Sequence, residues 1–446
     1  MRHTRTVLPV PIVDAGRWAR SRHLTQSPAV IHYVANLRRI RREAWVVLAG
    51  AAVRGFTWTG VSDTILSLYL LRMGYGPAFI GAAAAASNLG YAVAAMPGAA
   101  VARRIGARAG LIVGSLIWAL GLVLLSFADL LPGGWQQPWI LTMWLVAAGG
   151  RALDAVSGQP YLTESTTPRE RPHAFALMIA FSPVGSFLGS LVAGLLPGIL
   201  IASGALRATL DHPRPYGVAM ALAMLIYVPM VAIFLTLPKR TLPTGPAPAR
   251  SVRGRAPWGV LGAIGVVCVL RVSGEFTART FFAVHLDSTW AVAAAQIGAA
   301  VATANLLSIP APLITPLLVE RLGRAGTIAL GALGVAVSIL LLGLSPTWQA
   351  AAVAFVAMTV LAAMARSVWS LVVQESVQPA WRSAAAGVSN FTSGLGVAAM
   401  SSAGGVMAAT LGFRATFTTS AALVGLGALY VWFAFRTRAG EPACAH

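Results

Sequence analysis

Long apolar runs recur along the whole of this 446-residue chain and constrain its fold more than any other feature. Each run is close to the ~20 residues that an α-helix needs to cross a lipid bilayer. Only 10% of the residues are charged, against about a quarter in an ordinary soluble protein. The simplest interpretation is one large all-α membrane protein, not a series of soluble domains.

Charged residues, Pro and Gly divide the apolar runs into twelve predicted transmembrane helices. Six lie in the first half, at 45–71, 76–101, 109–128, 138–161, 173–202 and 216–237. Six lie in the second half, at 257–283, 290–318, 326–345, 347–373, 383–410 and 413–435. We therefore expect a basic N-terminal arm (1–44), a six-helix bundle (45–237), a linker (238–256), a second six-helix bundle (257–435) and a tail (436–446).

The segments between these spans carry most of the net charge of +20. Arginine gathers in the arm, in the linker and in alternate loops, whereas the opposite loops hold few basic residues. Cytoplasmic loops of membrane proteins are enriched in Lys and Arg. We therefore expect a multi-pass protein of the cell (inner) membrane with both termini in the cytoplasm and with the lipid bilayer, not nucleic acid, around it.

The two halves of the chain are related in sequence. A shift of 217 residues aligns three features: Arg54 with Arg271, Ile80-Gly81 with Ile297-Gly298, and Asn88 with Asn305. A shift of 211 residues aligns the Glu-Ser-x-x-Pro-x-x-Arg segments that begin at Glu164 and Glu375. Each half has an even number of spans and so enters and leaves on the same side, which makes the halves parallel repeats of the kind found in one large class of transporters.

The loop after the second span of each half has a further pattern. In the second half it reads Leu318-Val319-Glu320-Arg321-Leu322-Gly323-Arg324. In the first half, residues 101–108 keep the glycine and the basic residues but have Arg103 in the acidic position. This pattern resembles the loop after the second helix in the major facilitator superfamily, and the resemblance extends over residues 45–435. It implies two pseudo-symmetric six-helix bundles that transport a solute by alternating access.

The same loops predict a cytoplasmic gate. Glycine permits the tight turn, and ion pairs between helix ends would lock one of two states. The alternative is that these arginines only determine the topology. The predicted gate residues are Arg104, Gly106, Arg108, Glu164, Arg171, Glu320, Arg321, Gly323, Arg324, Glu375 and Arg382.

Charged side chains within membrane spans are costly and usually functional. All of them lie in the first, fourth, seventh or tenth span: Arg54, Asp63, Arg151, Asp154, Arg271, Glu275, Arg279 and Arg366. The family resemblance implies that these four helices line the central cavity. Arg54 and Arg271 occupy matching positions near the midplane, and one arginine on each of the first and seventh helices is similar to the pattern of organophosphate–phosphate antiporters.

Five arginines against three acids leave two surplus positive charges inside the membrane. A guanidinium binds carboxylate or phosphate with two parallel hydrogen bonds, so the surplus favours an anionic substrate. The alternative is that Arg54 and Arg271 only pair with acids and hold helices together. The predicted substrate-binding residues are Arg54, Arg271, Arg151, Asn88, Asn305, Trp58 and Glu275.

Three acids are candidates for proton coupling. Glu275 has an arginine four residues away on either side, and Asp154 lies three residues after Arg151, so both should stay ionised. Asp63 has no such partner in the sequence and is the freer candidate.

The function we favour is a secondary active transporter of a small solute, with protons or an exchanged anion as the other partner. The alternative is a proton-coupled exporter of amphipathic, drug-like compounds, and a remote alternative is a transport-derived membrane sensor. The sequence contains no phosphate-binding glycine-rich loop, no His-Glu-x-x-His motif and no cysteine cluster. We therefore expect no enzymatic activity, no cofactor and no metal, and we expect a monomer.

Overall fold

A computed structural model of the chain describes residues 41–167, 170–239, 257–378 and 381–436. These residues form helices joined by short turns, and no strand occurs among them. Residues 1–40 of the predicted arm, 240–256 of the predicted linker and 437–446 of the predicted tail lie outside the described residues. The first of the described helices, α2, begins at Arg42, three residues before the start that the sequence predicts for the first span.

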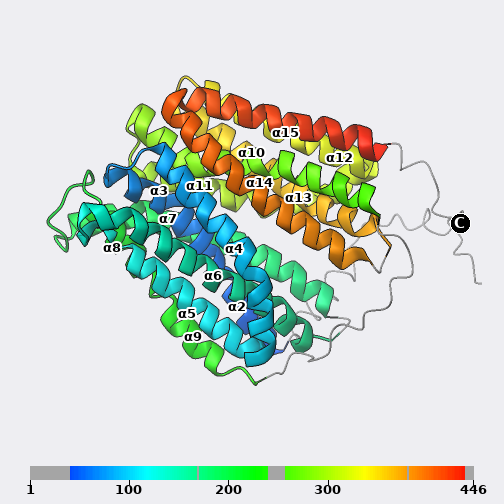
Figure 1. The fold of residues 1–446 in the computed structure, drawn as a ribbon, viewed down its shortest axis with the longest axis horizontal. Helices are drawn as coiled ribbons and strands as arrows, with labels where there is room; N and C mark the ends of the chain where they lie inside the picture. The colour runs from blue at the N-terminus through cyan, green and yellow to red at the C-terminus, as the bar shows by residue number, and fades with distance from the viewer. Residues whose placement is uncertain (1–40, 168–169, 240–256, 379–380, 437–446) are drawn as a thin grey trace, which may run out of the picture. The chain divides into compact units, whose positions relative to one another are not determined.

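Helices of the first half follow the six predicted spans (Figure 1). The first span consists of three consecutive helical segments, α2 (Arg42–Gly55), the π-helix η2 (Phe56–Ser62) and α3 (Asp63–Arg72). The others are α4 (Pro77–Ile105), α5 (Ala107–Leu125), the short 3-10 helix η3 (Ala128–Leu130), α6 (Gly133–Ser165), α7 (Arg171–Ala202), and the pair α8 (Arg214–Met224) and α9 (Tyr227–Leu235).

The second half is built in the same way from α10 (Trp258–Trp290), α11 (Ala294–Ser308), α12 (Ala311–Leu344), α13 (Trp348–Glu375), α14 (Arg382–Thr410) and α15 (Gly412–Arg436). The predicted span 290–318 is interrupted, because α11 ends just before Pro310, whose ring removes a backbone donor. Within α12 two helical segments meet at Gly323, where φ is 70°.

Ten helical segments of the described residues are long and apolar enough to cross a membrane. A shorter apolar helix, α11, together with the first part of α12 corresponds to the eighth predicted span, and α14 corresponds to the eleventh. Each of the twelve predicted spans therefore has a helical counterpart.

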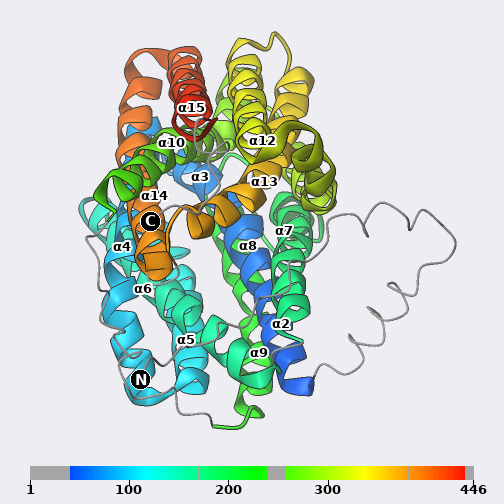
Figure 2. The ribbon, with the colours of Figure 1, turned by 90° about the vertical axis from the view of Figure 1, so that its right-hand side faces the viewer.

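The two halves meet where α4 crosses α14 and where α7 crosses α11 (Figures 1 and 2). Both crossings depend on glycine. A Cβ on Gly298 would lie 2.6 Å from the carbonyl oxygen of Ser190, and a Cβ on Gly81 would collide with the carbonyl oxygen of Ser401. The shift of 217 residues relates the two glycines, and the shift of 211 relates the two serines. The sequence duplication therefore appears in the structure as two equivalent helix crossings.

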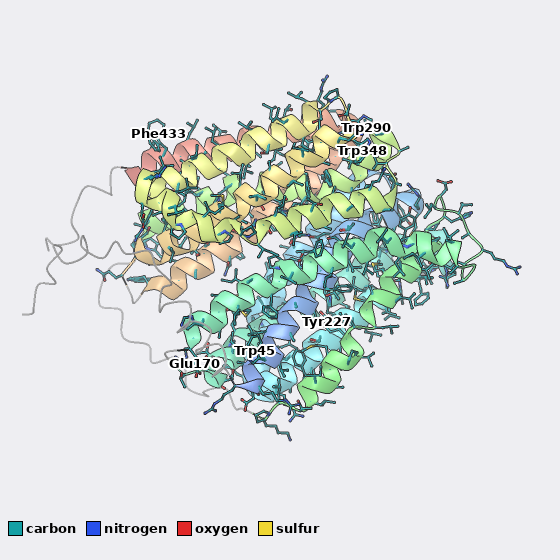
Figure 3. All side chains as sticks on the ribbon, turned by 180° about the vertical axis from the view of Figure 1, so that it is seen from behind. Trp45, Glu170, Tyr227, Trp290, Trp348 and Phe433 are labelled. Atoms are coloured by element: carbon teal, nitrogen blue, oxygen red, sulfur yellow. The ribbon has the colours of Figure 1, made fainter. Side chains whose placement is uncertain are left out.

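One ion pair also joins the halves, at the end where α3 and α10 finish. Both terminal nitrogens of Arg72 donate to the carboxylate of Asp287, at 2.6 and 2.8 Å, and Arg72 Nε donates to the carbonyl oxygen of Leu210 at 3.0 Å. By the predicted topology this is the extracellular end. Toward the opposite end, the ribbons of the two bundles run apart to the labelled residues Glu170 and Phe433 (Figure 3).

Candidate functional site

A π-helical segment places the first residues of the site. Within η2, the hydroxyl of Ser62 donates to the carbonyl oxygen of Thr57 at 2.8 Å, and Asp63 begins α3 directly afterwards. The wider turn of a π-helix changes the direction in which the following side chains point, and such segments occur often at functional sites. As a result Trp58, Ser62 and Asp63 all face one cavity.

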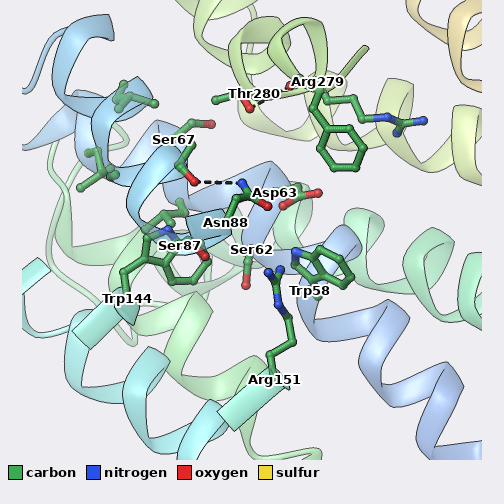
Figure 4. Close-up of a pocket in the computed structure, with 16 residues that line it drawn as sticks. Trp58, Ser62, Asp63, Ser67, Ser87, Asn88, Trp144, Arg151, Arg279 and Thr280 are labelled. Atoms are coloured by element: carbon green, nitrogen blue, oxygen red, sulfur yellow. Dashed lines mark hydrogen bonds between the residues drawn. The ribbon is translucent and has the colours of Figure 1, made fainter. Parts of the chain in front are cut away.

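This central cavity lies between the two halves (Figure 4). Its volume is about 660 Å³, including space open to solvent. Four elements of the first half (η2, α3, α4 and α6) and one of the second half (α10) supply its walls. The polar and aromatic lining residues are Trp58, Ser62, Asp63, Ser67, Ser87, Asn88, Trp144, Arg151, Phe276, Arg279 and Thr280. The lining therefore combines hydrogen-bonding groups, charges of both signs and aromatic rings.

Arg151 lies at the centre of the first half and lines two cavities. Its guanidinium is 4.0 Å from the ring centroid of Trp58 and 4.3 Å from that of Tyr91. The residue is only 7% exposed, and its Nε has no hydrogen-bond partner within the described part of the chain. Two aromatic faces thus stabilise the charge of Arg151, while no acid of the described segments forms an ion pair with it.

The second cavity lies within the first half, measures about 570 Å³ including space open to solvent, and contains an ion pair. Nη1 of Arg54 donates to Oδ2 of Asp154 at 3.1 Å. The sequence spacing predicts instead that Asp154 pairs with Arg151, and that interpretation is wrong. Arg151 is turned toward aromatic rings from other helices, which leaves the carboxylate of Asp154 to the arginine of α2.

Glu275 forms the centre of a charge cluster in the second half. Its Oε1 accepts a hydrogen bond from Arg279 Nε at 3.1 Å and another from Arg366 Nη1 of α13. The sequence places both Arg271 and Arg279 beside Glu275, and only Arg279 makes the contact. Arg271 is 4% exposed, forms no ion pair with any described residue and lies 5.9 Å from the ring centroid of Trp369.

Asp63 faces the central cavity and is exposed to it. It forms no ion pair or hydrogen bond through its carboxylate among the described residues, although Arg151 and Arg279 line the same cavity. Figure 4 shows the carboxylate of Asp63, the amide of Asn88 and the guanidinium of Arg151 directed into this shared space. The symmetric pair that the sequence emphasises, Arg54 and Arg271, does not line this cavity.

The predicted gate residues lie at the opposite end of the helices from the Arg72–Asp287 pair. Gly106 and Gly323 have φ values of 88° and 70°, as the tight turns require. Arg108 and Arg171 donate to the backbone carbonyls of Leu235 and Thr163. Glu320 is exposed and forms no ion pair with a described residue. Three further predicted residues, Arg104, Arg321 and Arg324, are exposed, Glu164 is half-buried, and the side chains of Glu375 and Arg382 lie outside the described part of the structure.

Sequence reasoning missed several residues of the site. Tyr91 and Trp118 surround Arg151 from α4 and α5, and no spacing along the chain shows that these helices meet α6 at that depth. The sequence does contain a signal for the Arg72–Asp287 pair. Arg72 lies at the end of the first span, and the oppositely charged Asp287 lies near the end of α10, the seventh span.

Comparison with known proteins agrees with this architecture. No curated protein matches the chain. Similar solved structures include a D-xylose–proton symporter (16% identical, TM-score 0.70, covering 90% of this chain and 97% of that chain). Others are a bacterial homologue of the human lysosomal transporter Spinster, inward-facing and occupied (14%, 0.68, 92% and 98%), and the nucleoside transporter NupG (14%, 0.66, 90% and 100%).

These likenesses, all at low identity, show the fold. The family model described as the Major Facilitator Superfamily matches residues 46–273 and again 264–445, so each half of the chain matches separately. Together the two matches cover nearly all of the described residues. The chain belongs to the Major Facilitator Superfamily.

Proposed function

We propose that the chain is a secondary active transporter that moves a small organic anion across the membrane by alternating access. The observation that carries this proposal is Arg151, a buried cation that lines the central cavity and has no acidic partner among the described residues. An unpaired arginine inside a membrane costs at least ~2.5 kcal/mol. A carboxylate or phosphate of the substrate would offset that cost with a charge-assisted hydrogen bond.

The balance of charges around the site supports an anion. Arg54 and Asp154 neutralise each other, and Glu275 neutralises one of the two arginines that contact it. Asp63 offsets one more positive charge. Across the eight charged residues of these four helices, five arginines and three acids leave a surplus of two positive charges.

The remainder of the lining supports a substrate with an apolar part. Trp58 and Trp144 of the first half and Phe276 of the second provide aromatic surface. Such rings take up the flat or aliphatic part of a ligand, while a few polar groups determine its orientation. We therefore expect an organic anion, not a bare inorganic one, to bind best.

Asp63 is the group that we propose for proton coupling. In this structure the carboxylates of Asp154 and Glu275 each form an ion pair with arginine, so protonation of either would break that pair. Asp63 has no such partner among the described residues and faces the cavity. One of the similar structures is described as a proton symporter, which adds support to this assignment.

The proposal is tested by ligand-induced stabilisation of the purified protein. The panel contains lactate, benzoate, glycerol 3-phosphate and inorganic phosphate as anions, and rhodamine 6G and ethidium as cationic dyes. We expect organic anions to raise the melting temperature. Replacement Arg151→Gln should weaken their binding roughly tenfold or more, the loss typical of one charge-assisted hydrogen bond. Arg414→Gln, at an exposed position outside the cavities, is the matched control.

The second candidate function is export of amphipathic, drug-like compounds, which the other aromatic residues of the cavity lining, Trp144 and Phe276, favour. Stabilisation by the dyes alone would support this candidate and would reject the anion proposal. The anion proposal would also be rejected if the Arg151 and Arg414 variants lost the same amount of binding affinity for organic anions.

A further inference from the structure

The duplication places two asparagines at equivalent positions, one in each half. Each follows a crossing glycine by seven residues, Asn88 after Gly81 and Asn305 after Gly298. Both glycines lie where one half packs against the other. If the two asparagines had the same role, they would make the same contact.

Asn305 makes a contact across the interface. Its Nδ2 donates to the hydroxyl of Ser190 at 3.3 Å, which joins α11 of the second half to α7 of the first. Ser190 in turn donates to the carbonyl oxygen of Ser186 at 2.8 Å. Asn305 is 8% exposed and lines neither of the two cavities described above. Its role is therefore interhelical bonding.

Asn88 does not make the equivalent contact. The residue equivalent to Ser190 is Ser401, in α14, which packs on α4. The hydroxyl of Ser401 is completely buried and has no hydrogen-bond partner in the described residues. Instead, Nδ2 of Asn88 donates to the carbonyl oxygen of Ala84 in its own helix at 2.9 Å (Figure 4).

The amide of Asn88 thus faces the central cavity, beside Asp63 and Ser87. A carboxamide offers two donors and one acceptor. The bond to Ala84 uses one donor, which leaves the other donor and the carbonyl oxygen for a ligand. The α4–α14 crossing leaves the hydroxyl of Ser401 without a partner among the described residues, and so lacks the hydrogen bond that stabilises the α7–α11 crossing. A local loss of stability of this kind is typical of a site where a residue, in this case Asn88, serves a function.

We propose that Asn88 recognises a neutral hydrogen-bonding group of the substrate, such as a hydroxyl, while Asn305 serves only the interface. The inference rests on the proposed function in one respect, namely that the same substrate carries its anionic group toward Arg151. The substrate class is then a hydroxylated organic anion. The internal duplication supplies the control, because Asn305 is the same residue in the same register of the other half.

The first experiment compares matched ligands that differ in hydroxyl groups. The pairs are lactate and propionate, 4-hydroxybenzoate and benzoate, and glycerol 3-phosphate and propyl phosphate. In the unmodified protein the hydroxylated member should bind at least tenfold more tightly, because a site built to bind a hydroxyl disfavours the analogue that lacks it. Asn88→Ala should abolish this preference, and Asn305→Ala should preserve it. A preference that survives in Asn88→Ala, or disappears equally in both variants, would overturn the inference.

The second experiment needs no substrate. In a chain with Cys268→Ser and Cys444→Ser, the variants Asn88→Cys and Asn305→Cys are treated with N-ethylmaleimide. The first should react at least tenfold faster, and Ser190→Cys provides a second interface reporter if Asn305→Cys does not fold. Comparable rates would overturn the inference. Absence of binding by every anion, together with selective labelling at residue 88, would reject the proposed anion transport and retain a cavity-facing Asn88.

Discussion

Asp63 and Arg151 of the first half line the same cavity, but their side chains have different surroundings. Arg151 lies against the rings of Trp58 and Tyr91 and forms no ion pair with an acid in the described part of the chain. Asp63 is therefore not committed to an ion pair and remains open to the cavity. A substrate anion at Arg151 and a proton at Asp63 would occupy one cavity, so each would influence the binding of the other.

Replacement of Asp63 by Asn tests this coupling. The amide keeps the size of the side chain but carries no titrating proton. We expect uptake driven by a proton gradient in proteoliposomes to be lost, while exchange of labelled for unlabelled substrate continues. Asp154→Asn is the comparison variant, because the carboxylate of Asp154 is already bonded to Arg54. A pH dependence of transport that is unchanged in Asp63→Asn would exclude Asp63 as the coupling group.

At this scale the sequence identifies the residue types of the site better than their partners. The eight charged positions follow from the composition of the spans, because a charge within an apolar run is conspicuous. Which charges pair depends on helix contacts that sequence spacing does not contain. Asp154 bonds Arg54, 100 residues away, and Arg366 reaches Glu275 across 91 residues.

At the scale of elements, the two halves are held together by helix crossings with close backbone contact. Gly194 of α7 packs against Gly298 of α11, and a Cβ on Gly194 would lie 2.8 Å from the carbonyl oxygen of Ala294. Close backbone contact lets small residues hold membrane helices together without hydrophobic driving force. The same property makes the crossings intolerant of added volume.

Gly298→Ala should therefore destabilise the protein. The new methyl group would lie 2.6 Å from the carbonyl oxygen of Ser190, and overpacking of this kind costs about 1–3 kcal/mol. Gly198→Ala is the matched control in α7, because nothing lies within 4 Å of a Cβ at that position. We expect the first variant to melt several degrees below the unmodified protein and the control to match or exceed it, since alanine favours a helix. Equal melting temperatures for the two variants would contradict the assignment.

Elements are also the scale at which the sequence is most informative. The apolar runs predict a helical counterpart for each of the twelve spans, although the eighth is divided between α11 and α12. The glycines of the loops after the second and eighth spans predict the turns at Gly106 and Gly323. The π-helix η2 could not be predicted, because its residues Phe56–Ser62 suit an ordinary α-helix equally well. Packing against α7 accompanies the wider turn, as a Cβ on Gly60 would lie 2.7 Å from Gly189 Cα.

At the scale of the whole molecule, the contacts between the halves that involve described residues are distributed unevenly between the two ends. The glycine crossings, the Asn305–Ser190 bond and the Arg72–Asp287 ion pair all join the halves. At the other end, Glu320 of the predicted gate forms no ion pair with a described residue. This distribution is the one expected for a transporter whose cavity opens toward the cytoplasm, if the basic loops mark that side.

The Arg72–Asp287 pair should then stabilise this state relative to the outward-open one. Both side chains are mostly buried, at 20% and 9% exposure, and the guanidinium also lies over the ring of Tyr216. The ion pair must break when the end of the bundle that carries it opens, so its free energy stabilises only the state in which that end is closed. A loss of ~1.4 kcal/mol would change the ratio of the two states tenfold.

Spin labels at the exposed residues Thr209 and Ser288, one in each half, would report that opening as a distance distribution. Arg72→Gln should increase the population at longer distances, because the amide cannot replace a bidentate charged contact. Asp287→Asn should have the same effect for the same reason. The exchange Arg72→Asp with Asp287→Arg should restore the short distance, since it preserves the ion pair while reversing its direction. Distances that stay the same in both single variants would mean that the glycine crossings alone close this end, and that the ion pair has no part in choosing the state.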